Sequence, residues 1–303
     1  MGNDWTELKI NSIEELLERV SRVLETVEKD DRYRQSIAIL SDLLENDGNI
    51  DDDLENVEMY LAGELHDADG EFPMHPEIVY LLFDIYEDCI ERGNAAAMCN
   101  MGSLYYTGRA GEQNYEKAAY YYDMADKAGD RQATENLGYI YYYGRTGKTD
   151  YEKAFKYFVK GALDGHMRSL YKIGDFYKNG FYVEKDPKEA FAIYARCTET
   201  MTDEAVPSVG ADVYMRMGDC LFEGIGVEKD LLAAQRFMNM AENLFYRRFM
   251  EGDFYQKKNL EHVIETEAKI RKQIAEELLP DLSWAGYFHV CLMTGRSMGS
   301  FRP

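Results

Sequence analysis

Residues 101–108 read Met-Gly-Ser-Leu-Tyr-Tyr-Thr-Gly, and the same alternation of apolar, glycine and aromatic residues returns at 137–144 and 173–180. The chain therefore repeats itself every 36 residues, and its glycines fall in three columns: Gly93, Gly129 and Gly165; Gly102, Gly138 and Gly174; Gly108, Gly144 and Gly180. A period of this length is typical of stacked helix pairs, which usually serve as binding scaffolds.

Each repeat predicts two antiparallel helices. Met101 and Leu104 are three residues apart, so they share one face of the first helix. Gly102 lies inside that helix, where glycine costs up to about 1 kcal/mol relative to alanine. We expect close approach of the second helix, through its small residue Ala118, to offset this cost. Gly108 should then end the first helix in a left-handed conformation.

A column of short polar residues precedes each predicted second helix. Asparagine and aspartate are strong N-cap residues, and a proline follows one of them at position 187, as expected for a first helical turn. We interpret the column as structural caps rather than catalytic carboxylates: Asn114, Asp150, Asp186 and Asp230.

A fourth repeat, marked by Gly218, follows the third after a longer interval. Gly218 lies 44 residues beyond Gly174 instead of 36. The extra residues fall within 198–211, where Pro207 and Gly210 predict a longer loop.

The pattern weakens toward both ends, which predicts four segments. Ser12 and Glu15 form a capping-box pattern ahead of the first amphipathic helix, and a second helix is expected around 36–44. Helices at 54–65 and 78–92 would form a degenerate repeat, and a long helix at 257–279 would cover the other end of the stack. The predicted segments are an N-terminal helical extension (1–50), a degenerate first repeat (51–94), the clear repeats (95–250) and a C-terminal capping helix with an irregular tail (251–303).

Charge and hydropathy limit the classes of partner. The chain has 303 residues with 34 basic and 56 acidic side chains, a net charge of −22, which would repel nucleic acid and anionic membranes. We interpret this charge as favouring solubility, with a basic partner surface as the alternative. No apolar run approaches the roughly 20 residues that span a bilayer, and no signal-like segment is evident, so we expect a cytoplasmic protein.

Cysteine and histidine spacing predicts neither a disulfide framework nor a metal site. Cys89, Cys197 and Cys220 occupy columns that hold small or apolar packed residues in other repeats, so we interpret them as buried and inert. No Cys-x-x-Cys or His-x-x-x-His occurs, and the histidines are interpreted as surface or capping residues. We expect no metal and no cofactor.

The run Met101-Gly102-x-Leu104-Tyr105-x-x-Gly108, followed by Lys117-Ala118-x-x-Tyr121-Tyr122, resembles the Sel-one-like repeat family, which is related to tetratricopeptide repeats. The resemblance covers residues 95 to 245 well. It implies an all-α fold, a right-handed α/α solenoid that serves as an adaptor or scaffold in protein complexes. Many secreted relatives carry a disulfide in each helix pair, and the lack of a repeated cysteine pair favours a cytoplasmic bacterial protein.

Two variable polar columns are the predicted binding residues. The resemblance implies that the first helices line the concave surface, so we expect these columns to contact a bound peptide or partner domain. An ordinary solvated face is the alternative. The residues are Asn100, Asn136, Lys172 and Arg216 in one column, and Ser103, Tyr139, Asp175 and Asp219 in the other.

The sequence thus predicts a non-enzymatic protein-interaction module, with two alternatives. A hydrolase of the penicillin-recognising type is suggested by Ser169-x-x-Lys172 and by descriptions of some relatives. However, Ser169 occupies a small packed column and the companion signatures are missing, so no catalytic residue is assigned. A homo-oligomeric assembly subunit is the other alternative.

Overall fold

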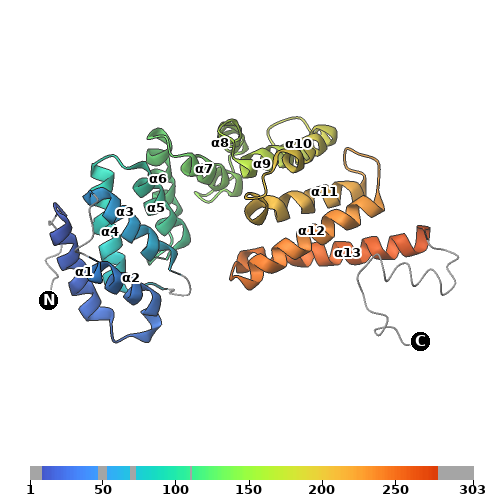
Figure 1. Cartoon of the computed structure of the whole chain (residues 1–303). Coiled ribbons are helices and arrows are strands. Elements are labelled where there is room, and N and C mark those ends of the chain that lie inside the picture. Colours follow the sequence, from blue (N-terminus) through green and yellow to red (C-terminus); the bar gives the residue numbers. More distant parts are fainter. Residues whose placement is uncertain (1–8, 47–52, 69–72, 110, 279–303) are drawn as a thin grey trace, which may run out of the picture. The chain divides into compact units, whose positions relative to one another are not determined.

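The computed structural model describes residues 9–46, 53–68, 73–109 and 111–278 (Figure 1). Over these ranges the regular structure is entirely helical, with no strand, which confirms the predicted all-α fold. The α-helices are α1 (Ile13–Val27), α2 (Arg34–Glu45), α3 (Leu54–Asp67), α4 (Pro76–Glu91), α5 (Ala95–Thr107), α6 (Tyr115–Lys127), α7 (Arg131–Tyr143), α8 (Tyr151–Leu163), α9 (Met167–Asn179), α10 (Pro187–Thr200), α11 (Ala211–Glu223), α12 (Leu231–Met250) and α13 (Lys257–Leu278).

Contacts divide the chain into two compact units, residues 1–164 and 165–303. Unit 1 contains α1 to α8 and unit 2 contains α9 to α13, so the boundary falls inside the predicted repeat region 95–250. Within each unit, successive helices form pairs that stack as in an α/α solenoid. Each helix packs most extensively on its pair partner: α3 on α4, α5 on α6, α7 on α8, α9 on α10, and α11 on α12.

An aromatic or methionine side chain of the second helix lies against the glycine inside each of the first helices α5, α7, α9 and α11. A methyl group on Gly138 would lie 2.7 Å from the Phe158 ring, and one on Gly102 would lie 2.7 Å from Tyr122. The expected contact of Gly102 with Ala118 is therefore wrong: the nearest atoms belong to Tyr122, one helical turn later. The missing side chain makes room for a ring, and the column continues with Tyr194 against Gly174 and Met238 against Gly218.

The turn inside each helix pair follows the predicted capping scheme. Gly108 is left-handed, with φ of 72°, and ends α5. The Asn114 side chain then accepts a hydrogen bond from the Lys117 N–H, and the Asn114 N–H donates to the Tyr105 carbonyl at 2.9 Å. Equivalent bonds are made at Asp150, Asp186 and Asp230, which confirms the column as structural caps.

The insertion before α11 is more helical than the predicted loop over 198–211. Helix α10 continues to Thr200, and the segment η3 (Val206–Gly210) is a π-helical turn that runs directly into α11. Gly210 keeps helical dihedrals, and a methyl group there would lie 3.0 Å from a Leu244 methyl carbon. Gly210 is thus needed for close packing and does not end a helix.

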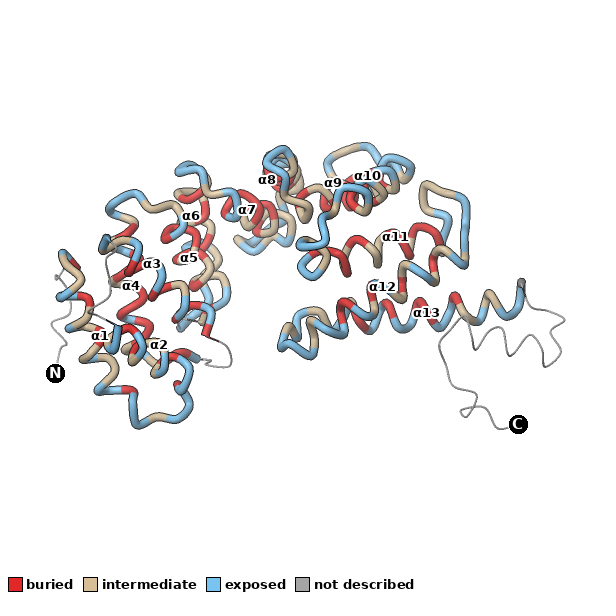
Figure 2. The backbone as a smooth tube through the Cα atoms, viewed as in Figure 1, coloured by how far each residue is buried: buried red, intermediate tan, exposed pale blue. Residues whose placement is uncertain are grey.

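Both predicted terminal elements are present, with one difference in capping. The Ser12 hydroxyl accepts from the Glu15 N–H at 3.2 Å, but the Glu15 carboxylate accepts from the Asn11 N–H instead of the Ser12 N–H. At the other end, α13 packs on α12 and α11, and its buried residues follow the side facing them (Figure 2). The predicted tail at 284–303 lies outside the described residues.

Two protonatable side chains join α13 to its neighbours. Glu267 is 2% exposed, accepts from the Gln235 amide at 3.1 Å and is paired with Arg271. Burial raises the pKa of Glu267 to about 7, against the opposing effect of Arg271, and Glu242 on α12 raises it further. The His262 ring nitrogen lies 2.9 Å from the Asp219 carboxylate, and this hydrogen bond raises the pKa of His262.

The glycine contact predicts opposite effects for two Gly→Ala substitutions. Gly138→Ala should lower stability by about 1–3 kcal/mol, because overpacking against Phe158 outweighs the gain in helix propensity. Gly63→Ala in α3, where nothing lies within 4 Å of the added methyl, should be neutral or stabilising by up to about 1 kcal/mol. Urea unfolding followed by circular dichroism checks both, and equal midpoints would contradict the proposed contact.

Attachment of α13 should weaken as pH rises. Both raised pKa values mean that the docked helix binds protons more tightly than the detached one, so stability falls as Glu267 ionises toward pH 7 and as His262 loses its proton. Hydrogen exchange of α13 amides, corrected for intrinsic rates, should be faster at pH 8 than at pH 5.5. Glu267→Gln should remove most of this difference. Amides of α5 provide the control, and a uniform change across both helices would refute a local effect.

Candidate partner-binding site

A pocket of about 370 Å³ opens on unit 1 where α3, α5 and α7 lie beside one another. It brings together three of the predicted binding residues, Asn100, Ser103 and Asn136. These come from two successive first helices, at positions one residue on either side of the repeated apolar-glycine pair. The remaining lining residues are Gly63, His66, Asp67, Cys99, Tyr106, Tyr122 and Gln132.

His66 forms the polar floor of this pocket. Its Nδ1 lies 3.3 Å from the Tyr86 hydroxyl and its Nε2 lies 3.3 Å from the Ser103 hydroxyl. Tyr86 donates to the Ala62 carbonyl at 3.2 Å, so a consistent network has Nδ1–H donating to Tyr86 and Nε2 accepting from Ser103. Burial lowers the pKa of His66, which keeps the ring neutral, as this network requires.

The expectation of surface or capping histidines is wrong for His66, which is only 9% exposed. It is correct for His75, whose ring caps α4 by accepting from the Glu77 N–H at 3.2 Å. His66 lies in the degenerate repeat, where the glycine columns are missing. The repeat alignment therefore gave no signal that this side chain would meet the binding columns.

Asn100 and Asn136 are half-buried and keep unused hydrogen-bonding capacity at the pocket. Asn136 accepts from the Gln132 amide at 3.3 Å, and its own amide nitrogen lies 3.9 Å from the Cys99 sulfur. Burial raises the pKa of the Tyr86 phenol, and the Asn100 amide opposes this effect. A side-chain amide offers two N–H groups and an oxygen acceptor, so each retains groups that a ligand can engage.

The second predicted column varies with the ring that it touches. Tyr139 makes an edge-to-face contact with Phe158 at 5.3 Å, whereas Asp175 accepts from the Tyr194 hydroxyl at 2.7 Å. Burial raises the pKa of the Tyr122 phenol, and the neighbouring Ser103 side chain opposes this effect. A hydroxylated ring thus receives a polar neighbour and phenylalanine receives an aromatic one. Residue type in this column therefore varies with the second-helix ring that it contacts, in addition to any variation that a ligand imposes.

In unit 2 the predicted residues form a buried ionic cluster. Arg216 contacts Asp175 through Nε at 2.7 Å and Nη2 at 2.8 Å, and Lys172 Nζ lies 3.2 Å from the same carboxylate. Burial would raise the pKa of Asp175, but Arg216 and Lys172 outweigh it and hold that pKa below its usual range. The sequence predicts a solvent-facing stripe, yet Lys172 and Asp175 are less than a tenth exposed. Asp219 is likewise engaged, by His262.

The Ser169-x-x-Lys172 motif does not form an accessible nucleophile pair. Ser169 is fully buried, and its hydroxyl has no hydrogen-bond partner among the described residues. The Lys172 amine is bound to Asp175 instead. A covalent mechanism requires the base within hydrogen-bonding reach of an exposed hydroxyl, and this site meets neither condition.

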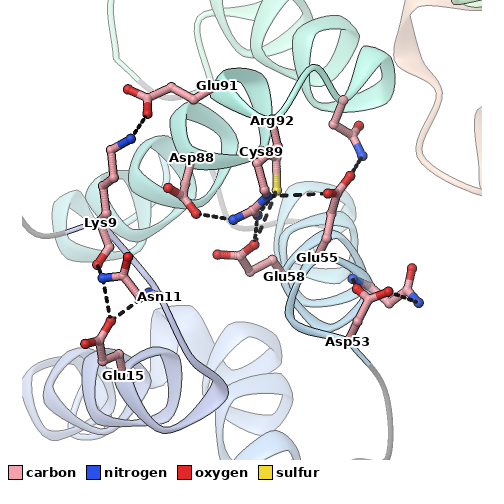
Figure 3. Close-up of polar contacts among 12 residues, drawn as sticks. Lys9, Asn11, Glu15, Asp53, Glu55, Glu58, Asp88, Cys89, Glu91 and Arg92 are labelled. Atoms are coloured by element: carbon pink, nitrogen blue, oxygen red, sulfur yellow. Dashed lines mark hydrogen bonds and ion pairs between the residues drawn. The ribbon is translucent and has the colours of Figure 1, made fainter.

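A second polar cluster, around Arg92, joins α3 to the end of α4 (Figure 3). Arg92 contacts the carboxylates of Glu55, Glu58 and Asp88, and its Nη2 lies 3.3 Å from the Cys89 sulfur. Glu58 is fully buried, which raises its pKa, and Arg92 opposes this effect. Burial raises the pKa of the Cys89 thiol to about 12. Cys89, Cys197 and Cys220 are all buried, as predicted.

The part of the chain that the structure describes shows no further chemistry of these kinds. No set of three or more histidine, cysteine, aspartate or glutamate side chains among the described residues is arranged to hold a metal ion. None of the described helices is both long and apolar enough to span a membrane.

The repeat pattern places this chain among proteins built from Sel1 repeats. The Sel1 repeat family matches residues 95–130, 131–166, 168–196 and 211–244. The chain therefore contains four Sel1 repeats over this region. Proteins of this fold are typically protein-interaction modules. No match is found among curated proteins.

One solved structure of similar fold supports the same architecture, and two others show a weaker likeness. A Sel1 repeat protein from Oxalobacter formigenes is 19% identical, with a TM-score of 0.52, and the alignment covers 78% of this chain and 87% of that one. The protective antigen c5321 of uropathogenic Escherichia coli is 17% identical, with a TM-score of 0.47 and coverage of 97% and 66%. The immunity protein Pa5087 of Pseudomonas aeruginosa is 19% identical, with a TM-score of 0.35 and coverage of 64% and 83%. At this identity the first likeness shows the fold alone.

The Arg92 cluster predicts a large effect from one substitution. Arg92→Met should destabilise the protein by about 3–5 kcal/mol, because the Glu58 carboxylate would remain buried without its counter-charge. Lys9→Met removes an exposed ion pair with Glu91, which solvent screens, and should leave stability nearly unchanged. Thermal unfolding of both variants measures the difference. The defect of Arg92→Met should also shrink at acidic pH, where Glu58 takes up a proton; a defect that does not depend on pH would argue against the buried charge as its cause.

Proposed function

We propose that this protein is a non-enzymatic, cytoplasmic interaction scaffold that holds a peptide segment of a partner protein in the unit 1 pocket. The observation that carries the proposal is the convergence of Asn100, Ser103 and Asn136 on one hollow, above the buried His66. A ligand can engage amide groups there without breaking the network that holds the fold. In unit 2, by contrast, the equivalent positions stabilise the repeats through the Asp175 cluster.

The pocket suits a main-chain segment better than a charged small molecule. Its polar groups are mainly neutral, with two asparagine amides, a glutamine amide, a serine hydroxyl and tyrosine hydroxyls. Peptide groups need both donors and acceptors, and side-chain amides supply both. Asp67 at the pocket is exposed and negatively charged, and the whole chain carries −22, so a partner segment with basic residues is favoured.

The floor of the pocket is fixed before a ligand arrives. A chain of hydrogen bonds runs from the Ala62 carbonyl through Tyr86 and His66 to Ser103. These bonds fix the side chains beneath the proposed binding surface. A ligand therefore loses little affinity to ordering of these side chains. Lys172, Asp175, Arg216 and Asp219 are assigned a structural role, so the proposed contact set is restricted to unit 1.

Affinity capture from the native host, followed by mass spectrometry, tests the proposal with a matched pair of variants. Asn100→Ala/Asn136→Ala removes both asparagine amides of the pocket, whereas Asn243→Ala removes an exposed amide on α12. We expect a protein partner that wild type and the Asn243 variant retain, and that the double variant recovers at least tenfold less. A peptide from that partner should then bind in solution with the same ranking.

Three results would count against the scaffold at this site. One is recovery of the same partners by the double variant, with its circular dichroism unchanged. Another is a stable homo-oligomer with no other partner, which would favour the assembly-subunit alternative. The third is covalent labelling of the intact chain by a β-lactam that Ser169→Ala abolishes, which would restore the hydrolase alternative.

A further inference from the structure

Helix α12 continues beyond what the repeat requires. It has 20 residues, compared with 13 in α6 and 13 in α8, and the Sel1 match ends at residue 244. Leu244 and Phe245 are its last buried residues. The turns that follow are therefore an addition to the repeat, and packing within the repeat does not account for their side chains.

This addition exposes the densest group of large apolar side chains among the described residues. Tyr246 is 57% exposed, Met250 66%, Phe254 67% and Tyr255 92%, all within ten residues. The surrounding turn between α12 and α13 is exposed in Figure 2. The other exposed tyrosines, such as Tyr60 and Tyr80, are spread along separate helices. Clustered apolar exposure marks interaction surfaces in soluble proteins, whereas scattered residues do not.

The turn that carries these side chains is held in one conformation. Arg248 binds the Asp253 carboxylate at 2.8 Å, and the Asp253 N–H donates to the Arg248 carbonyl at 2.9 Å. The Phe254 ring packs edge-to-face on Phe249 with centroids 5.3 Å apart. The apolar groups are therefore presented on a fixed support, which reduces the entropy lost when a partner binds.

Basic side chains flank the exposed apolar group, in contrast with the acidic chain as a whole. Arg247, Lys257 and Lys258 are all exposed. Arg247 shares a helix face with Met250, three residues later. The ion pair that Lys257 makes with Glu261 is long, with 3.9 Å between Nζ and Oε1, and both side chains are exposed. Residues 246–258 contain four basic and two acidic side chains, Glu251 and Asp253, so this segment is locally positive in a chain whose net charge is −22.

We propose that the aromatic-basic turn, formed by Tyr246, Arg247, Met250, Phe254, Tyr255, Lys257 and Lys258, docks an acidic segment of a partner protein that carries apolar side chains between its carboxylates. The apolar residues of the partner segment cover Phe254 and Tyr255, and the carboxylates of that segment pair with the flanking cations. The net charge of −22 disfavours polyanions such as nucleic acid or an anionic membrane, which would approach the whole molecule. This surface belongs to unit 2, shares no residue with the unit 1 pocket and differs from it in charge preference.

A random peptide library displayed on phage, panned against the full chain, tests this proposal even while the partner protein is unidentified. We expect enriched peptides that combine aspartate or glutamate with leucine or aromatic residues. Their dissociation constants, measured by fluorescence anisotropy, should rise at least tenfold in Phe254→Ser/Tyr255→Ser and also in Arg247→Glu/Lys258→Glu. Tyr60→Ser and Tyr80→Ser remove exposed rings from unit 1 and should leave the constants unchanged. Binding should also weaken as KCl is raised.

Several results would contradict docking of an acidic segment at this turn. Enrichment of basic peptides, of no peptide, or of peptides that bind both turn variants as tightly as wild type would overturn the proposal. So would binding of wild type to phosphatidylserine vesicles that the aromatic variant loses, which would assign the turn to a membrane surface. Self-association that the same variant abolishes would assign it to a second copy. Asn100→Ala/Asn136→Ala should not alter binding at the turn, so failure here is distinguishable from failure at the unit 1 pocket.

Discussion

The fold of the repeats depends on a side chain of the second helix that fills the space left by a glycine in the first. The glycine weakens its own helix, and the loss is offset because Tyr122, Phe158 or Tyr194 can pack directly against its backbone. This contact also reaches the surface. The residue that follows the glycine lies beside the second-helix side chain that packs there. Ser103, Tyr139 and Asp175 therefore differ partly because the neighbouring second-helix rings differ.

Polar side chains at equivalent repeat positions therefore differ between the two units in charge and in the hydrogen-bond partners that they have. In unit 2 the Asp175 carboxylate is satisfied by Arg216, Lys172 and Tyr194, and such a cluster is costly to disturb. In unit 1 the same columns contain asparagine and serine, which are neutral and retain hydrogen-bonding capacity at a pocket. Because an uncharged amide can exchange water for a ligand at little cost, unit 1 is the better place for a binding site.

Additions outside the repeats supply the other distinctive features of this chain. The degenerate pair α3 and α4 contributes His66 to the pocket and is secured by the Arg92 cluster. The extension of α12 creates the aromatic-basic turn, and α13 covers the last pair through groups that bind protons. The two proposed surfaces, one favouring a basic segment and the other an acidic segment, would bind two unlike partners.

The sequence alone determined the helix pairs, their turns and their caps, because these depend on neighbours a few residues away: Gly108 has the left-handed conformation that glycine permits, and Asn114 bonds to an N–H three residues on. It also determined that Asn100 and Asn136 recur in phase. Only the tertiary structure decided that Tyr122 rather than Ala118 meets Gly102, that 206–210 is helical, that His66 joins the pocket and that Lys172 is buried. Each of these features depends on which residues distant in the chain become neighbours, and a local sequence pattern does not predict such contacts.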